Sequence, residues 1–64
     1  MSPQDNAAIS KIYREIPGRT VDLASRAHKF LYKTYELLLL MEKQGLVRRT
    51  LGPTHSLDLW EKIE

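Results

Sequence analysis

Apolar residues near the start of the chain recur at helical spacing and predict a helix over residues 3–15. Ser2 is expected to cap this helix, and Asp5 stands where the acid of a capping box belongs. Pro17-Gly18 then ends it, because neither residue continues a helix well. The apolar residues that share one face at intervals of three and four are Ile9, Ile12, Tyr13 and Ile16.

A second, shorter helix is expected from Thr20 to about His28 or Lys29, after a short extended stretch at Arg19-Thr20. Thr20 is expected to be the N-cap, and Asp22 falls in the first turn, near the positive end of the helix dipole. The apolar positions of this helix are Val21, Leu23, Ala24 and Ala27.

The pattern predicts a third helix that starts between Leu31 and Lys33 and ends at Gln44. Leu37, Leu38 and Met41 have the spacing of a buried helical stripe, and Gly45 supplies a left-handed stop. The connection over residues 28–32 carries neither glycine nor proline, so its boundary is weakly defined. Four consecutive leucines cover every side of a helix, so Leu40, and Leu39 beside it, are expected to be exposed.

The last quarter of the chain predicts a two-stranded ribbon, with strands over residues 46–51 and 56–60. Gly52-Pro53-Thr54-His55 is a turn between the two strands. Alternation in the second strand puts Leu57 and Leu59 on one face and Ser56, Asp58 and Trp60 on the other. Trp60 is expected to lie over the first helix as a lid on the core.

The length of 64 residues allows one domain with a small core. The chain has no cysteine and only two histidines, which argues against disulfides, a structural zinc site or any other bound cofactor. No apolar run is long enough to span a membrane, and the first residues do not resemble a signal peptide, so a cytoplasmic protein is expected. The net charge of +2 permits nucleic-acid binding without requiring it.

Two stretches together resemble the winged helix-turn-helix family of small bacterial, archaeal and phage transcriptional regulators. They are TVDLASRA at residues 20–27 and KTYELLLLMEKQGLVRR at residues 33–49, and residues 41–49 are the most specific part. The resemblance implies an α+β fold: a three-helix core with a C-terminal two-stranded β-wing, in a single domain over residues 1–64. It also implies a transcriptional regulator that binds double-stranded DNA, with the third helix in the major groove and the wing on the backbone.

The candidate nucleic-acid-binding residues fall in four groups. The cations around the second and third helices would form an electrostatic footprint for a polyanion if they share a face, and are otherwise scattered solubility charges. The paired arginines would grip phosphates at the base of the wing, or be a solvated pair on an edge strand. The turn would donate to phosphate, or be a hairpin turn alone. The residues are Arg19, Arg26, Lys29 and Lys33, then Tyr32 and Glu36 on the third helix, then Arg48 and Arg49, then Thr54 and His55.

The third helix departs from the family pattern at its start and along its outer face. The family usually has Ser, Thr, Arg, Gln or Asn there, whereas this chain has Phe30, Leu31, Tyr32, Lys33, Glu36 and Leu40. An exposed apolar surface of this kind usually marks an interface. The alternative interpretation is therefore a winged-helix protein-interaction module that does not bind DNA.

Two further expectations follow from the same residues. DNA-binding modules of this size usually dimerise, because one module makes few contacts, and the exposed leucines or the first helix could form a homodimer contact. Catalysis is not expected: His28 has no neighbouring nucleophile at helical spacing, and Asp22, Glu36 and Glu42 do not make a convincing acid–base pair.

Overall fold

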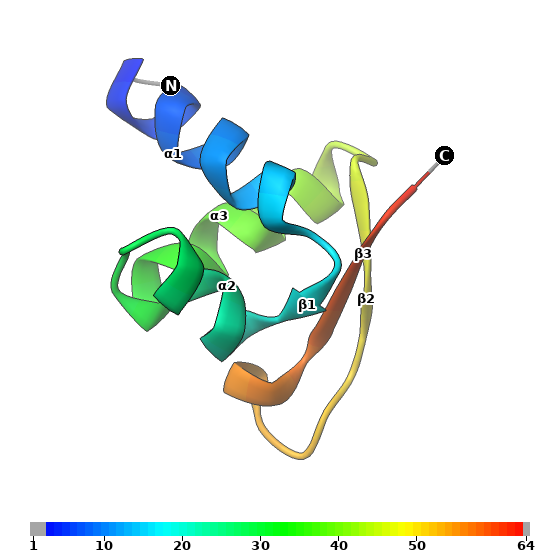
Figure 1. The fold of residues 1–64 in the computed structure, drawn as a ribbon. Helices are drawn as coiled ribbons and strands as arrows, with labels where there is room; N and C mark the ends of the chain where they lie inside the picture. Colours follow the sequence, from blue (N-terminus) through cyan, green and yellow to red (C-terminus); the bar gives the residue numbers. More distant parts are fainter. Residues whose placement is uncertain (1–2, 64) are drawn as a thin grey trace.

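The computed structural model describes residues 3–63, and side chains from residue 6 onward. Three helices lie on one side of the molecule and a small antiparallel sheet lies on the other (Figure 1). The elements follow one another as α1 (Pro3–Glu15), β1 (Gly18–Arg19), α2 (Thr20–Arg26), α3 (Leu31–Lys43), β2 (Val47–Thr50), the 3₁₀ turn η1 (His55–Leu57) and β3 (Leu59–Lys62). This order and arrangement are those of a winged helix, so the predicted α+β fold class is confirmed.

The sheet has three strands in the order β1-β3-β2, with β3 antiparallel to both neighbours. The short strand β1 pairs Gly18 with Trp60, which ties the loop after α1 to the wing. On the other edge, Arg48 stands opposite Glu61, a cross-strand pair of opposite charge. The wing is therefore attached to the helical core through β1 as well as through the chain that leaves α3.

The core lies where the three helices meet the sheet. The predicted stripes are confirmed: Ile12 of α1, Ile16 just after it, and Leu38 and Met41 of α3 are buried. The remaining buried apolar members of the core are Ala8, Leu23, Ala27, Leu37, Val47 and Trp60.

The helices α2 and α3 end in the same way at their C-termini. At the end of α3, Gly45 adopts a φ of 79°, and the amides of Gly45 and Leu46 donate to the carbonyl oxygens of Glu42 and Met41. At the end of α2, His28 adopts a φ of 55°, and the amides of His28 and Lys29 donate to Ser25 and Ala24. Both are Schellman motifs, in which a left-handed residue lets the chain satisfy the last helical carbonyls. His28 thus forms the left-handed turn at the end of α2, a position for which the sequence has no glycine.

The prediction that Thr20 caps α2 is wrong. Arg19 occupies the N-cap position, and its guanidinium donates to the carbonyl oxygen of Leu57. Thr20 is the first helical residue and is fully buried. Its hydroxyl accepts a hydrogen bond from Trp60 Nε1 at 2.7 Å and donates to the carbonyl oxygen of His55 at 2.9 Å, so it joins α2 to the wing. The helix also ends at Arg26, two to three residues earlier than expected.

The predicted second strand of the wing is shifted toward the C-terminus. Residues 55–57 form the turn η1, and β3 begins at Leu59 and continues to Lys62. Asp58 and Trp60, which were expected to share a face, are both buried, whereas Leu57 is exposed. Trp60 is not a lid over α1: it lies inside the core, with its ring edge against Tyr35 of α3 at 6.1 Å between centroids.

The remaining boundaries differ little from expectation. The helix α3 ends at Lys43 with Gln44 as its C-cap, and β2 is shorter than residues 46–51. Leu39 and Leu40 were expected to be exposed but are half-buried, and Leu39 packs against the core. The capping contacts expected of Ser2 and Asp5 remain predictions. Ser2 lies outside the described residues, and the side chain of Asp5 lies outside the described side chains.

Candidate nucleic-acid interface

The outer face of α3 is set by its 100° spacing. Because Leu37, Leu38 and Met41 point into the core, the opposite side of the helix carries Tyr32 and Glu36, both of which are exposed. Lys43 continues this outer stripe toward the C-terminal end of the helix. The side chains available to an approaching partner on this face are therefore an aromatic ring, a carboxylate and an ammonium group.

The N-terminal end of α3 is the most exposed apolar part of the described chain. Phe30 is 87% exposed and Tyr32 is 75% exposed, and Leu31 between them is also accessible. A shallow concavity of about 460 Å³ beside this end is lined by His28, Lys29, Phe30 and Lys33. We call residues 29–33 the open end of α3, because aromatic rings and ammonium groups lie there side by side in solvent.

A second concavity separates the open end from the wing. It has a volume of about 250 Å³ and is mostly apolar, and it lies between α3 and the turn η1. Within it, Tyr35 and His55 stack at a tilt, with ring centroids 5.0 Å apart. The turn is therefore held beside the N-terminal half of α3. The lining residues are Thr20, Leu31, Tyr32, Tyr35, His55 and Ser56.

Arg49 points from β2 toward α3 and is largely enclosed, with 24% of its side chain exposed. Its Nη1 donates to the Tyr35 hydroxyl at 2.8 Å and lies 3.8 Å from Asp58 Oδ2, and its Nε lies 3.6 Å from Glu42 Oε2. The guanidinium also lies over the Trp60 ring, 5.8 Å from the centroid. The contacts with Tyr35 and Glu42 join the wing to α3, and those with Asp58 and Trp60 join the two sides of the wing, so Arg49 has a structural role.

Asp58 is the acidic centre of the same group. Its side chain is 1% exposed, and Oδ1 accepts a hydrogen bond from the amide of Gly52 at 2.8 Å. The other oxygen, Oδ2, has no hydrogen-bond partner among the described residues, but it lies 3.7 Å from His55 Nδ1 as well as near Arg49. Since a buried carboxylate is costly without a cation nearby, Arg49 stabilises it. We call Tyr35, Glu42, Arg49, His55 and Asp58 the Arg49 cluster.

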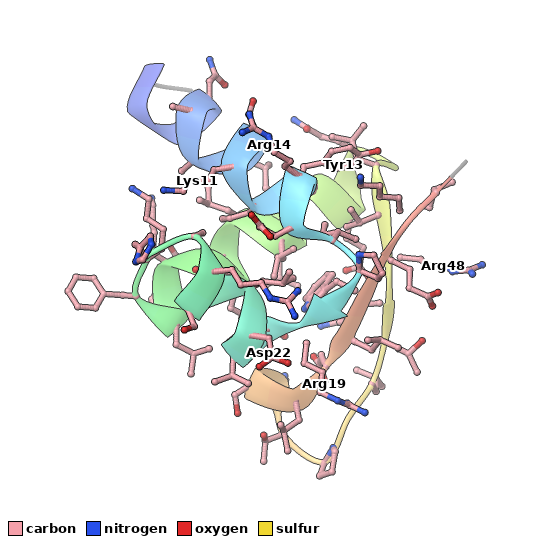
Figure 2. All side chains as sticks on the ribbon, viewed as in Figure 1. Lys11, Tyr13, Arg14, Arg19, Asp22 and Arg48 are labelled. Carbon is pink, nitrogen blue, oxygen red and sulfur yellow. The ribbon has the colours of Figure 1, made fainter. Side chains whose placement is uncertain are left out.

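The other arginines expected in the interface lie in different directions. Arg48 alternates with Arg49 along β2, is 68% exposed and pairs with Glu61 at 3.7 Å. Figure 2 shows Arg48 projecting away from the outer edge of the sheet, while Arg19 projects near the start of α2. Arg26 reaches back toward α1, with Nη1 3.5 Å from the carbonyl oxygen of Glu15.

The predicted residues therefore do not form one continuous basic face. The structure places Lys29 and Lys33 on one concavity at the start of α3, and it places His55, next to Thr54, across a second concavity from Tyr32. Glu36 lies one turn further along the outer face of α3. The loop between α2 and α3 lies on the opposite side of the molecule from β2, as Figure 1 shows, so Arg48 is far from the open end.

Sequence reasoning missed the role of Asp58 and the structural role of Arg49. Asp58 and Trp60 do alternate with Leu57 and Leu59, but an apolar pair is the usual choice for a buried face, and here the polar member is buried. The sequence did hold one signal for this role. An acid in the predicted second strand, Asp58, could pair with an arginine of the first strand, and the backbone amide of Gly52 in the turn between them could donate to it. The apolar start of α3 was noticed in the sequence, and Phe30 and Leu31 join Tyr32 there.

The described part of the chain offers neither a metal site nor a membrane-spanning helix. Across residues 3–63, no group of three or more histidine, aspartate or glutamate side chains is placed to hold a metal ion. Over the same stretch, no helix is long and apolar enough to cross a lipid bilayer.

Comparisons with known proteins support the fold. The structure is similar to that of a probable transcriptional regulator from Pseudomonas aeruginosa, with a TM-score of 0.69 and 17% sequence identity over 98% of this chain. The chain spans about half of that protein, 48% of its length. No family model and no curated protein sequence matches the chain. At this identity the likeness shows that the two chains share a fold.

Proposed function

We propose that this chain is the DNA-binding module of a transcriptional regulator and that it binds duplex DNA through the open end of α3 and the turn η1. In helix-turn-helix proteins the N-terminal residues of the second helix of the motif contact base edges in the major groove. Here that end carries Lys29, Tyr32 and Lys33 in solvent. The solved regulator that shares the fold agrees with this role.

The observation that carries the proposal is the shared concavity between α3 and the wing. It holds His55 and Ser56 of the turn beside Leu31 and Tyr32 of the open end. A groove edge that met the open end would therefore also meet the turn, where the Thr54 and Ser56 hydroxyls lie 2.9 Å apart. Hydroxyls and backbone amides of this kind position a protein on phosphates without reading sequence.

In this proposal some charged residues of the module contact DNA and others hold the wing in place. Lys29 and Lys33 supply the cations of the proposed phosphate contacts, and the Arg19 guanidinium lies near the turn as an additional candidate. The His55 imidazole is a further polar group of the turn. Arg49 instead holds the wing against α3, so that the turn and the open end keep a fixed spacing. Glu36, on the outer face, disfavours phosphate at its own position and accepts hydrogen bonds from base donors.

A titration of labelled duplex DNA at several salt concentrations tests the proposal. Each phosphate contact contributes about −0.9 to the slope of log K against log salt concentration. The Lys29→Ala/Lys33→Ala variant should therefore bind more weakly and lose about two units of slope. The matched control is Arg14→Ala/Arg48→Ala, which removes two charges from α1 and from the outer edge of β2.

The control should retain the affinity and slope of the parent chain within a small margin, since those arginines lie outside the proposed interface. Equal losses in both variants would show that binding follows net charge alone. Absence of binding to any duplex at the lowest salt concentration would refute the proposal.

A protein-interaction module is the second candidate function. The exposure of Phe30, Leu31 and Tyr32 favours it, because adjacent accessible apolar side chains commonly mark a protein contact. The simplest such partner is a second copy of the chain. Sedimentation equilibrium would show concentration-dependent association that Phe30→Ala abolishes, and a monomer at all concentrations would exclude the homodimer.

A further inference from the structure

The open end of α3 offers an unusual set of side chains for reading base pairs. Residues 30–40 contain no arginine, asparagine or glutamine, so they lack the side chains that make paired hydrogen bonds to adenine, and Lys33 is the one cation of this stretch that could donate to guanine. The major groove also displays the 5-methyl group of thymine, which apolar side chains contact directly. Of the polar side chains on this part of α3, Glu36 can accept a hydrogen bond from cytosine N4.

The apolar side chains lie where base edges would be met. Phe30, at the N-cap of α3, is the most exposed of the large apolar side chains in the described chain, and Tyr32 follows in the first turn. Lys29 and Lys33 line the same concavity as Phe30, so cations flank the ring. A major groove that contains thymine presents apolar methyl groups between two rows of phosphates. The aromatic rings could contact the methyl groups while the flanking ammonium groups contact the phosphates.

We propose that Phe30 and Tyr32 are specificity-determining residues that select thymine by packing against its 5-methyl group in the major groove. The inference rests on the proposed function, because it concerns the same interface. The expected recognition element contains thymines at the positions nearest the start of α3. Adenine is not selected there by paired hydrogen bonds, because the stretch has no asparagine or glutamine.

Replacing thymine by deoxyuridine removes this methyl group and leaves base pairing intact. A duplex is first selected from a random library on the immobilised chain, and each thymine is then replaced in turn. Loss of one contacted methyl group should weaken binding about fourfold, the equivalent of about 0.8 kcal/mol for one buried methyl or methylene group. The effect should be confined to one or a few thymines in the selected duplex.

Variants of the protein identify the side chains involved. The Phe30→Ala and Tyr32→Ala variants should bind the thymine duplex more weakly and should no longer distinguish thymine from deoxyuridine at the matching position. Tyr32→Phe should keep the discrimination, since it retains the ring. Leu51→Ala is the matched control, because Leu51 is an exposed apolar residue outside α3, and this variant should discriminate as the parent chain does.

The outcomes separate the two proposals. If the parent chain binds the selected duplex but tolerates deoxyuridine at every position, DNA binding stands and thymine selection is refuted. If discrimination persists in both alanine variants, other residues read the methyl group and the inference is also refuted. If the chain enriches no duplex and binds none at low salt, the proposed function fails, and this inference fails with it.

Discussion

The wing-facing side of α3 and its N-terminal end use the same residue types for different purposes. On the wing-facing side, Tyr35 and Glu42 hold Arg49, which in turn lies beside the buried Asp58. At the N-terminal end, Tyr32 and Lys33 face solvent. An aromatic residue and a cation occur in both places, but only at the second are they accessible to a partner.

This difference shows that the role of a charged residue depends on what lies opposite it. Arg48 and Arg49 are neighbours in the sequence, yet one faces the outer edge of the sheet beside Glu61 and the other is enclosed by the Arg49 cluster. Strand alternation separates the two, and a buried acid opposite one of them decides its role. Counting cations along the sequence therefore overestimates the interface.

The largest effect is expected from Leu38→Ala, which removes the support of both regions. Leu38 is fully buried in the core between α3 and the other elements. Deleting such a side chain costs about 2–5 kcal/mol, so the thermal midpoint should fall steeply or folding should be lost. Circular dichroism melting measures the change. An unchanged melting temperature would mean that α3 faces another way.

Arg49→Ala should come next, and Arg48→Ala is its matched control one residue away. Loss of the Arg49 guanidinium leaves the buried Asp58 carboxylate without its strongest cation, which should cost about 1–3 kcal/mol. The exposed pair of Arg48 with Glu61 contributes at most about 1 kcal/mol. Urea unfolding of both variants measures the difference. Equal losses of stability would contradict the structural role of Arg49.

The smallest effects compare the two Schellman turns that bracket α3. An alanine at residue 45 must adopt the left-handed backbone, so Gly45→Ala should destabilise the fold by about 1–2 kcal/mol. His28→Gly relieves similar strain but adds glycine's entropic cost of about 0.5–1 kcal/mol, so a small net stabilisation is expected. Chemical unfolding measures both. A loss of stability in His28→Gly would show that the His28 side chain stabilises the turn.

These two turns also show what a sequence can reveal about the fold. A glycine at residue 45 indicates a left-handed helix end, so the end of α3 was predicted within one residue. His28 adopts the same backbone without glycine, so the end of α2 was placed too late. The helical stripes were predictable because burial follows a 3.6-residue period. The expected exposure of Leu39 was wrong because it packs against the core, which helical spacing alone does not reveal.

The wing and the candidate site were less predictable for a related reason. The register of β3 depends on Trp60 reaching Thr20, a contact between residues 40 positions apart in the chain. Local alternation fitted a strand over residues 56–60 equally well, although Ser56 and Leu57 belong to the turn η1. Likewise, the types of candidate residue could be read from the chain, but the fold was needed to separate Lys33 at the open end from Arg49 in the Arg49 cluster.

The most direct measurement of the central claim is a map of backbone amide chemical shifts during a titration with duplex DNA. The open end of α3 and residues 54–56 should shift together, while Arg14 in α1 and Arg48 in β2 should change little. Shifts confined to α1 or to the outer edge of β2, with the open end unaffected, would contradict the proposed interface.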